Sequence, residues 1–575
     1  MRIYEAIVKG LENIGVGAAF GGAGESDAGL MLALEHSARI KPVITRNEQA
    51  ASFMACGYAM FTDRLGVCFS TAGPGAFNLI SGLSVALMDS YPVLAITGAS
   101  TLKWRGKGSL NETSGIGRTP NGQLVFDAIT KKSIELTDVA QTCGALEELV
   151  NLAFAGRPGP VHLAVPADLT DPDISVDNYR DMRLDVQPIR PDPTSLKAAA
   201  GALADAVRNG KRVLVLAGYG AVRSHAGRDL QAFVERFQIS VITTMDGKGI
   251  IPEEHPLAVG VLGLSGHSSA RKAFQDADVV LAIGNSFAQH ATFNFQEDLF
   301  DGKTLIQINI GQEEIDKVYK STYSIRADAR LAIVGLAEEM SRTVSSVPVR
   351  DFETQDYETE KILGLGRLIN PGELTQALSR LLPDNAIVLG DAGTHSAWLA
   401  YYLELREGQY FRKPGTFAPM AGNTNGALGV KCAYPDRTVV VGCGDGCYLM
   451  SGFELLTAVE YDIPVIWIIF DDDEFKLIKL EQLVTYHETA LVEFKNPDYV
   501  AYANACGADG YRVETLEEFE EAFKAAVDSG KPTLIDAKIT RLALPHYSPS
   551  LEGLPKSIVE GTWEAIRRWF GLPSQ

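Results

Sequence analysis

Two acidic segments of the chain have the residue types and the spacing to bind one divalent cation. Asp445 stands at the centre of a Gly-Asp-Gly sequence, and Asp472 follows it by 27 residues inside the acidic run 471–474. Both segments come directly after apolar runs, 438–441 and 463–470, which are typical of strands buried in a parallel sheet. Two carboxylates at such strand ends could share Mg²⁺ and, through it, hold a diphosphate. The alternative is a tight turn followed by a solvated acidic loop.

The elements around these acids would bring them to one edge of a sheet. Between the two apolar runs, Leu455, Leu456, Ala458 and Val459 suit the covered face of a helix. In a strand–helix–strand unit both strands end at the same edge, where α/β folds bind ligands. Helical and strand patterns alternate in this way along most of the chain, which predicts an α/β fold with parallel sheets.

This alternation predicts three consecutive domains, each built on a doubly wound parallel sheet. A Pro-rich, strand-poor linker, 176–193, separates the first two, and an acidic linker, 351–360, precedes the third. The predicted domains are 1–175 (N-terminal), 193–345 (central) and 365–545 (C-terminal), followed by a tail, 546–575. The predicted strands include 66–70, 92–97, 161–165, 212–216, 240–243, 279–283 and 304–309.

Composition excludes several classes of partner. The chain has 575 residues and a net charge of −20, which argues against binding to a nucleic-acid backbone or to an anionic membrane surface. No apolar run reaches the ~18 residues of a transmembrane helix, and the N-terminus resembles an amphipathic helix rather than a signal peptide. Seven scattered cysteines indicate reduced core residues, so we expect a cytoplasmic protein.

A second group of residues with possible chemistry lies near the N-terminus. Glu48 opens a predicted helix around Ala50–Met60, and a Gly-rich turn that contains Gly73 and Asn78 follows a predicted strand. Such a turn lets a ligand approach the backbone. Taken alone, however, Glu48 is an ordinary acid in a first helical turn, and the Gly-rich turn lacks the Lys and Ser/Thr of a P-loop.

Taken together, the motifs resemble the thiamine-diphosphate enzymes of the acetolactate synthase and pyruvate oxidase group. The resemblance covers about residues 1–545 and implies a pyrimidine-binding, a central and a diphosphate-binding domain, in that order. The motifs that carry it, besides the Gly-Asp-Gly unit, are Arg46-x-Glu48, Gly73-Pro74-Gly75-x-x-Asn78, Arg157-Pro158-Gly159-Pro160-Val161, Gly247-Lys248-Gly249 with His255-Pro256-Leu257, Asp391-x-Gly393-x-His395-x-x-Trp398, and Met420 nine residues before Gly429.

The resemblance implies roles for individual residues. Glu48 would be the catalytic glutamate that hydrogen-bonds the aminopyrimidine ring of the cofactor. Asp445 and Asp472 would bind Mg²⁺ through their side chains and Glu474 through its backbone carbonyl. Met420 would bend the cofactor, although a methionine that only fills the core is the simpler reading. The implied cofactor-binding residues are Gly73, Asn78, Thr394, His395, Ala418, Met420, Gly444, Gly446 and Cys447.

In this family the glutamate and the metal ligands come from different subunits. The resemblance therefore implies a homodimer or homotetramer with active sites at the subunit interface. Asp472 departs from the family, since most relatives have Asn there. The substrate-site candidates are Glu25, Arg118, Phe475 and Glu481. Glu25 could equally be a helix N-terminal acid, and Arg118 a surface residue.

The implied reaction begins with decarboxylation of a 2-oxo acid, pyruvate or a close relative. The cofactor accepts the electron pair as CO₂ leaves, and the resulting enamine is joined to a second carbonyl compound, as in acetolactate synthesis. Alternatives are a decarboxylase that does not ligate, a lyase or hydrolase that cleaves a C–C bond, and, from another class, a catalytically inactive regulatory homologue. FAD is possible but disfavoured, because Asn285-Ser286-Phe287-Ala288 stands where flavin-binding relatives have Arg-Phe-Asp-Asp.

Overall fold

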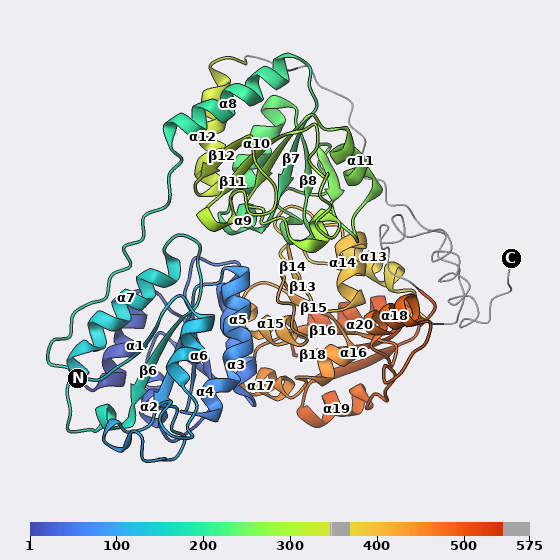
Figure 1. Ribbon diagram of the computed structural model, residues 1–575. Coiled ribbons are helices and arrows are strands. Elements are labelled where there is room, and N and C mark those ends of the chain that lie inside the picture. The colour runs from blue at the N-terminus through green and yellow to red at the C-terminus, as the bar shows by residue number, and fades with distance from the viewer. Residues whose placement is uncertain (345–346, 348–367, 544–575) are drawn as a thin grey trace.

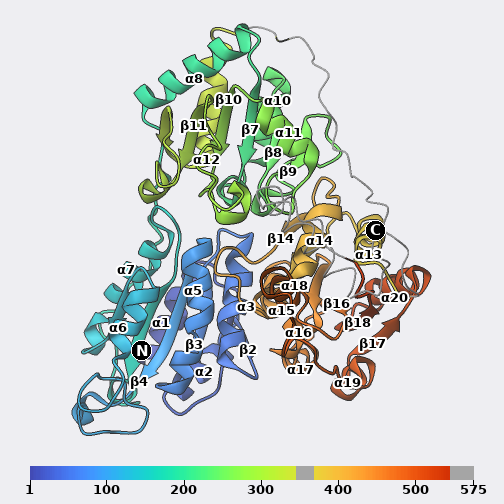
Figure 2. The same ribbon diagram turned by 45° about the vertical axis from the view of Figure 1, so that its right-hand side comes forward.

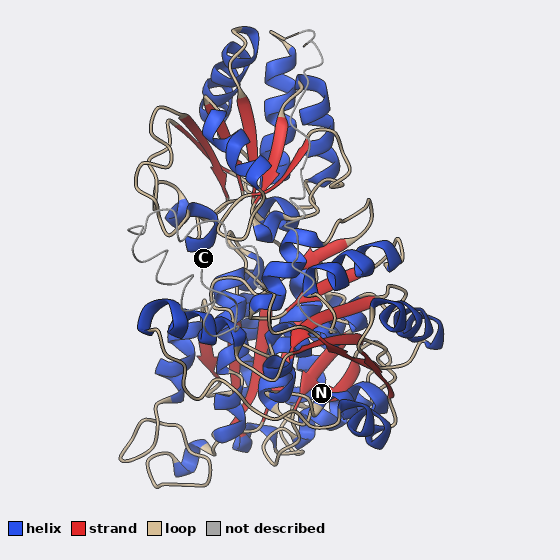
Figure 3. Ribbon diagram, turned by 90° about the vertical axis from the view of Figure 1, so that its right-hand side faces the viewer, coloured by secondary structure: helices blue, strands red, loops and turns tan. Residues whose placement is uncertain are grey.

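The computed structural model describes residues 1–344, 347 and 368–543. The predicted tail 546–575, the acidic linker 351–360 and the predicted domain ends at 345, 365 and 545 lie outside the described residues. Three six-stranded parallel sheets follow one another along the described chain. Helices cover both faces of each sheet (Figure 1; Figure 3), which confirms the predicted class of three consecutive doubly wound α/β domains.

The first sheet has the strand order β2-β1-β3-β4-β6-β5. Its four inner strands are buried on both faces because alternate residues, such as Val67 and Cys68 of β3, enter two different apolar cores. Its strands are β1 (Ala18–Gly21), β2 (Lys41–Ile44), β3 (Gly66–Ser70), β4 (Val93–Ala99), β5 (Ser133–Glu135) and β6 (Val161–Pro166). Its helices are α1 (Ile3–Asn13), α2 (Ala28–Glu35), α3 (Glu48–Met60), α4 (Pro74–Asn78), α5 (Ile80–Asp89), α6 (Gly122–Ile129) and α7 (Thr142–Phe154).

The central sheet has the order β12-β11-β10-β7-β8-β9, and the predicted strands 240–243, 279–283 and 304–309 coincide with β8, β10 and β11. The described segment 171–192, which leads into it, contains neither helix nor strand, and α8 begins at Pro193, the last residue of the predicted linker 176–193. Its strands are β7 (Val213–Ala217), β8 (Ser240–Thr243), β9 (Ala258–Val261), β10 (Val279–Ile283), β11 (Thr304–Asn309) and β12 (Tyr323–Arg326). Its helices are α8 (Pro193–Arg208), α9 (Tyr219–Arg223), α10 (Gly227–Phe237), α11 (Ser268–Asp276) and α12 (Ala329–Ser341).

The third sheet, of order β14-β13-β15-β16-β18-β17, contains the predicted strand–helix–strand unit. Strands β15 and β16 pair in parallel, with Gly444 opposite Phe470, so their acidic continuations share one edge. The strands are β13 (Ile387–Gly390), β14 (Tyr410–Arg412), β15 (Val439–Gly444), β16 (Ile466–Asp471), β17 (Asp509–Val513) and β18 (Thr533–Lys538). The helices are α13 (Pro371–Leu381), α14 (Thr394–Tyr402), α15 (Gly422–Ala433), α16 (Asp445–Leu449), α17 (Glu454–Glu460), α18 (Lys476–Tyr486), α19 (Tyr499–Cys506) and α20 (Leu516–Ser529).

Helices α3 and α15 join the first and third domains through one shared core, and they lie side by side in both views (Figure 1; Figure 2). Their backbones touch where both helices carry glycine. A Cβ at Gly57 would lie 1.9 Å from the carbonyl oxygen of Gly426, and one at Gly429 would lie 1.8 Å from that of Met54. Glycine is required at this crossing because any side chain would force the helices apart.

A buried arginine connects all three domains. Arg412, at the end of β14, pairs with Asp246 of the central domain at 2.7 Å and with Asp89 of the first domain at 3.4 Å. Its guanidinium donates a hydrogen bond to the hydroxyl of Tyr91 at 3.0 Å and stacks 3.7 Å from the ring of Tyr219. We call this group of five residues the three-domain junction. A cation buried in this way is tolerated because carboxylates on both sides compensate it.

Candidate active site

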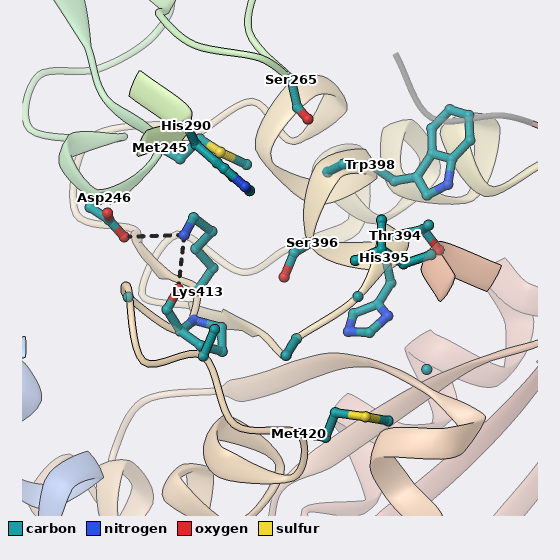
Figure 4. A pocket seen from close by; sticks show the side chains of 18 of the residues that line it. Met245, Asp246, Ser265, His290, Thr394, His395, Ser396, Trp398, Lys413 and Met420 are labelled. Carbon is teal, nitrogen blue, oxygen red and sulfur yellow. Dashed lines mark hydrogen bonds and ion pairs between the residues drawn. The ribbon is translucent and has the colours of Figure 1, made fainter. Parts of the chain in front are cut away.

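A cavity of about 500 Å³ lies at the carboxyl edge of the third sheet, facing the central domain (Figure 4). Its lining residues fall within 218–291 and 392–478, together with Ile539. This is the edge at which open α/β sheets bind ligands, and the volume suits a small organic molecule. The cavity lining includes Thr394, His395, Ala418, Met420, Gly444, Asp445, Gly446, Cys447, Asp472, Glu474 and Phe475.

Asp445 begins helix α16 directly after strand β15 and is 2% exposed. Its Oδ1 accepts a hydrogen bond from the backbone of Gly446 at 2.7 Å, and its Oδ2 accepts one from Asp473 N at 2.8 Å. The side-chain amide of Asn496 also donates to Oδ2, at 2.8 Å. Burial raises the pKa of Asp445 to about 6 against the opposing effect of the Asn496 hydrogen bond. These bonds hold the carboxylate in one orientation.

Asp472 lies one residue beyond β16 and is 7% exposed. Burial raises its pKa to about 7; the nearby Lys476 ammonium opposes this shift, and the charges of Asp445 and Glu474 add to it. Because the charge of Asp445 raises the pKa of Asp472, a cation bound nearby would stabilise both carboxylates. The donor set of carboxylate oxygens therefore fits Mg²⁺, which prefers hard oxygen ligands.

The side chain of Glu474 is occupied elsewhere. Its carboxylate pairs with Lys476 and, at 2.5 Å, with Lys479, and all three side chains are buried. Its backbone carbonyl is the group that the resemblance implies as a metal ligand. Among the described residues, no group of three or more His, Cys, Asp or Glu side chains could hold a metal.

The start of helix α14 has the features of an anion cradle. His395, in its first turn, is buried, and its Nε2 has no hydrogen-bond partner among the described residues. Burial lowers the pKa of His395 to about 4, so the ring is neutral at pH 7. A buried ring nitrogen without a partner and a helix N-terminus in one cavity wall both fit a diphosphate.

Met420 stands on a strained loop that forms the cavity floor. Its neighbours Ala418 and Ala421 have φ values of 43° and 67°, which side chains rarely adopt. A Cβ at Gly446 would lie 3.3 Å from Met420 Cε and 2.6 Å from a ring carbon of Phe475. Met420 and Phe475 therefore narrow the cavity above the Gly-Asp-Gly turn.

Glu48 lies in a separate part of the chain. Asn78 donates a hydrogen bond to its Oε2 at 2.9 Å, and Gly73, with φ of 65°, precedes helix α4, which carries Asn78. Glu454, 2% exposed in helix α17, accepts hydrogen bonds from the backbone of Arg46 at 2.9 Å and of Asn47. Neither Glu48 nor any other residue of the first domain is among the described residues that line the cavity.

The substrate-site candidates also fall into two groups, inside and outside the cavity lining. Phe475 lines the cavity, whereas Glu25, Arg118 and Glu481 are exposed and lie outside its lining. Asp27, two residues after Glu25, is instead 1% exposed, and neither of its oxygens has a hydrogen-bond partner of normal geometry within the described chain. Burial raises the pKa of Asp27 to about 7, and the charge of Glu48 adds to the shift.

Several polar residues of the cavity escaped the sequence analysis. Asp246, His290 and Lys413 line it from the central domain and from the loop after β14, and Asn496 orients Asp445 from behind. In the sequence, these residues are marked only by the adjacent basic pair Arg412-Lys413, which does not indicate which residues it contacts. Asp246, His290 and Lys413 come together because the central and third domains pack against each other.

Comparison with protein families identifies the class to which this fold and cavity belong. Residues 1–117, 200–336 and 391–537 match, respectively, the N-terminal TPP binding domain, the central domain and the C-terminal TPP binding domain of the thiamine pyrophosphate enzymes. The cavity with the Gly-Asp-Gly turn lies in the part matched by the central and C-terminal domains. The protein is a thiamine-diphosphate-dependent enzyme.

Individual relatives narrow the assignment. The chain is 32% identical over 576 residues to the "Probable acetolactate synthase large subunit" of Methanocaldococcus jannaschii, covering 96% of this chain and 94% of that protein. It is 31% identical to the acetolactate synthase large subunit of Parasynechococcus marenigrum, covering 93% and 87%. It is 29% identical to that of Corynebacterium glutamicum, covering 92% and 86%. The chain belongs to the acetolactate synthase and pyruvate oxidase family. None of the helices in the described ranges is long and apolar enough to cross a membrane.

Proposed function

We propose that the protein decarboxylates a 2-oxo acid of the pyruvate type and joins the product to a second carbonyl compound, in the manner of acetolactate synthase. The cavity at the carboxyl edge of the third sheet carries the proposal. It combines two buried carboxylates of raised pKa, a buried histidine whose Nε2 has no hydrogen-bond partner in the described part of the chain, and a methionine on a strained loop. These are the residue types that the bound cofactor requires at its metal, its diphosphate and its ring.

Thiamine diphosphate would lie along this cavity. His395 and the start of α14 would hold its diphosphate, while Asp445, Asp472 and the Glu474 carbonyl would hold Mg²⁺. When bound, the cofactor accepts the electron pair released as CO₂ leaves the 2-oxo acid. We propose no FAD, because the Asn285–Ala288 segment lacks the basic and acidic residues of flavin-binding relatives.

The chain's own residues would prepare the site for this chemistry. Glu48 would hold a proton at the aminopyrimidine ring, and Asn78 keeps the carboxylate of Glu48 in position. Met420 and Phe475 would exclude water and keep the cofactor bent. Asn496 fixes Asp445, so the metal would meet a carboxylate that is already oriented.

We propose that two chains share each active site. Glu48 and Asp445 belong to different parts of one chain, and Glu48 is absent from the described lining of the cavity. Three apolar side chains close in sequence to Asp445 and Asp472 are exposed: Met450 is 56% exposed, Phe453 67% and Ile478 47%. Exposed apolar side chains in such number mark an interaction surface, and a second copy that brought its Glu48 over the cavity would cover them. The assembly would be a homodimer or a homotetramer.

We also retain the predicted domain bounds, 1–175, 193–345, 365–545 and 546–575, as proposals. The described portions of the first three ranges each contain one sheet, and the three matched family domains fall within the same three ranges. All seven cysteines are free, which supports the proposal of a reducing, cytoplasmic location.

Reconstitution with a substrate panel tests the proposed reaction. The apo protein is loaded with thiamine diphosphate and Mg²⁺ and offered 2-oxo acids, with and without aldehydes, while CO₂ release and product mass are recorded. We expect CO₂ together with a 2-hydroxy ketone or a 2-hydroxy-2-oxoacid derivative. Aldehyde as the only product would identify a decarboxylase, and cleavage of an added 2-hydroxy ketone without CO₂ a lyase. No cofactor binding would support an inactive homologue.

A further inference from the structure

The cavity has a second polar end, opposite the diphosphate cradle. Lys413, on the loop after β14, turns its ammonium toward Asp246 and His290 of the central domain (Figure 4). Met420 lies seven residues further along the same loop and turns instead toward Gly446. A group bound at Lys413 is therefore separated from a group that reacts beside Met420.

The ammonium of Lys413 has donors to spare. Within the described chain it donates one hydrogen bond, to the carbonyl of Pro414 at 2.8 Å, and lies 3.7 Å from Asp246 Oδ1. The second distance is too long for a hydrogen bond. The Lys413 side chain lines the cavity and is only 13% exposed, so it is largely shielded from bulk water. A largely buried ammonium with unused donors favours an anionic ligand from the cavity.

The nearest carboxylate, Asp246, is shared between two cations, Lys413 and Arg412. Asp246 Oδ1 accepts a hydrogen bond from Arg412 Nη1 at 2.7 Å, and Arg412 belongs to the three-domain junction. The other lysine of the cavity, Lys476, is neutralised by Glu474 and by Asp472 at 3.6 Å. Within the described lining, Lys413 therefore shares its carboxylate partner, Asp246, with a second cation, Arg412.

His290 completes this end of the cavity. It comes from the short helical turn after β10 and points toward Lys413 (Figure 4). Partial burial and the Lys413 ammonium lower its pKa, so its ring is neutral at pH 7 and has one N–H donor. A neutral donor beside an ammonium suits a carboxylate or a similar oxyanion.

We propose that Lys413 and His290 form a subsite for an acidic group of the substrate that is remote from the reacting carbonyl. The inference rests on the proposed function and narrows its substrate class. One of the two carbonyl substrates, donor or acceptor, carries a second carboxylate or an equivalent sulfonate or phosphonate. A 2-oxo dicarboxylic acid has this form: its carbonyl reacts beside Met420 while its distal carboxylate binds Lys413.

Binding of unreactive acids to the holoenzyme tests the subsite without turnover. The protein, loaded with thiamine diphosphate and Mg²⁺, is titrated by calorimetry with glutarate and, as the monoacid control, with butyrate. One charge-assisted contact corresponds to about a tenfold to hundredfold difference in affinity. We expect glutarate to bind more tightly by such a factor and Lys413→Met to abolish the difference. Lys303→Met is the matched control, because the Lys303 ammonium also donates to backbone carbonyls, of Gln275 and Ala277, away from the cavity.

Equal affinities in the wild type, or a preference that survives in Lys413→Met, would overturn the subsite. Should Lys413→Met not fold, as judged by its thermal unfolding, Lys413→Gln supplies the same comparison with a polar side chain. Titration with inorganic phosphate separates a substrate subsite from a general anion site, since strong binding of phosphate would overturn the assignment to a substrate. If the subsite holds but no 2-oxo acid loses CO₂, only the proposed reaction fails. If pyruvate reacts but glutarate shows no preference, only the subsite fails.

Discussion

Replacing Asp27 by Asn should change the pH dependence of stability. The Asp27 carboxyl is 1% exposed, and burial raises its pKa from 3.8 to about 7. In the unfolded chain the same group is in water and loses its proton near pH 4. Asparagine has nearly the same shape but cannot ionise, so Asp27→Asn removes the proton uptake and little else.

The sign and size follow from this difference in pKa. Between pH ~4 and ~7 the folded protein holds one more proton at Asp27 than the unfolded chain does, so its free energy of unfolding falls as pH rises, by up to about 1.4 kcal/mol per pH unit. The contribution is fully present below pH ~4 and is lost as pH rises through about 7. Allowing for some solvent screening, the total is about 2–4 kcal/mol.

Urea unfolding at several pH values between about 5 and 8 measures this effect. We expect Asp27→Asn to be the more stable protein at about pH 8 and to lose that advantage toward about pH 5. Asp384→Asn is the control, because the Asp384 side chain is 94% exposed and the variant should follow the wild type throughout. Parallel pH profiles for the wild type and Asp27→Asn would refute the reasoning.

Three further substitutions test the site and the fold. Glu48→Gln should lower turnover at least ~10³-fold and leave thermal unfolding unchanged, whereas Glu35→Gln, at an exposed position of helix α2, should alter kcat less than about threefold. An active Glu48→Gln enzyme would contradict the proposed role. Asp472→Asn should weaken Mg²⁺ binding about tenfold, because the cation loses a carboxylate ligand. The same variant should stabilise the metal-free protein by about 1–2 kcal/mol, because it removes a buried charge. Identical Mg²⁺ titrations of the wild type and the variant would contradict a role for this charge. Arg412→Leu should lower the free energy of unfolding, measured in urea, by about 3–5 kcal/mol. Arg330→Leu, which removes an exposed ion pair, should lower it by less than about 1 kcal/mol. Equal losses for the two variants would show that the three-domain junction stabilises the fold no more than an exposed pair does.

The strands that could be predicted are those buried on both faces. Strand β10 is a continuous apolar run, and β8 and β11 are buried along almost their whole length. The bounds of all three follow from the sequence. Strand β14 (Tyr410–Arg412) was not predicted, because it has three residues, lies at a sheet edge and ends in a charge. Its position in the sheet, and therefore the direction of Arg412 and Lys413, depends on tertiary packing.

The residues of the candidate site could likewise be predicted only in part. Asp445 and Asp472 could be paired from sequence because consecutive parallel strands must end at one edge. Asp246 and Arg412 are 166 residues apart, and no local pattern indicates that they meet. Glu25 and Asp27 have similar side chains on one loop, and only the fold shows that Asp27 is the buried one. The sequence thus predicts which motifs act together within a domain, and the contacts between domains require the structure.

The three-domain junction limits how the chain can be taken apart and recombined. Its cation, Arg412, belongs to the third domain, while its anions, Asp89 and Asp246, belong to the first and central domains. A single domain expressed alone would carry an uncompensated charge on a surface that is buried between domains in the intact chain. A chimaera that exchanged the central domain with a relative's would have to transfer Asp246 and Arg412 as a pair. In a chimaera of this enzyme, the residues exchanged must therefore come from more than one domain.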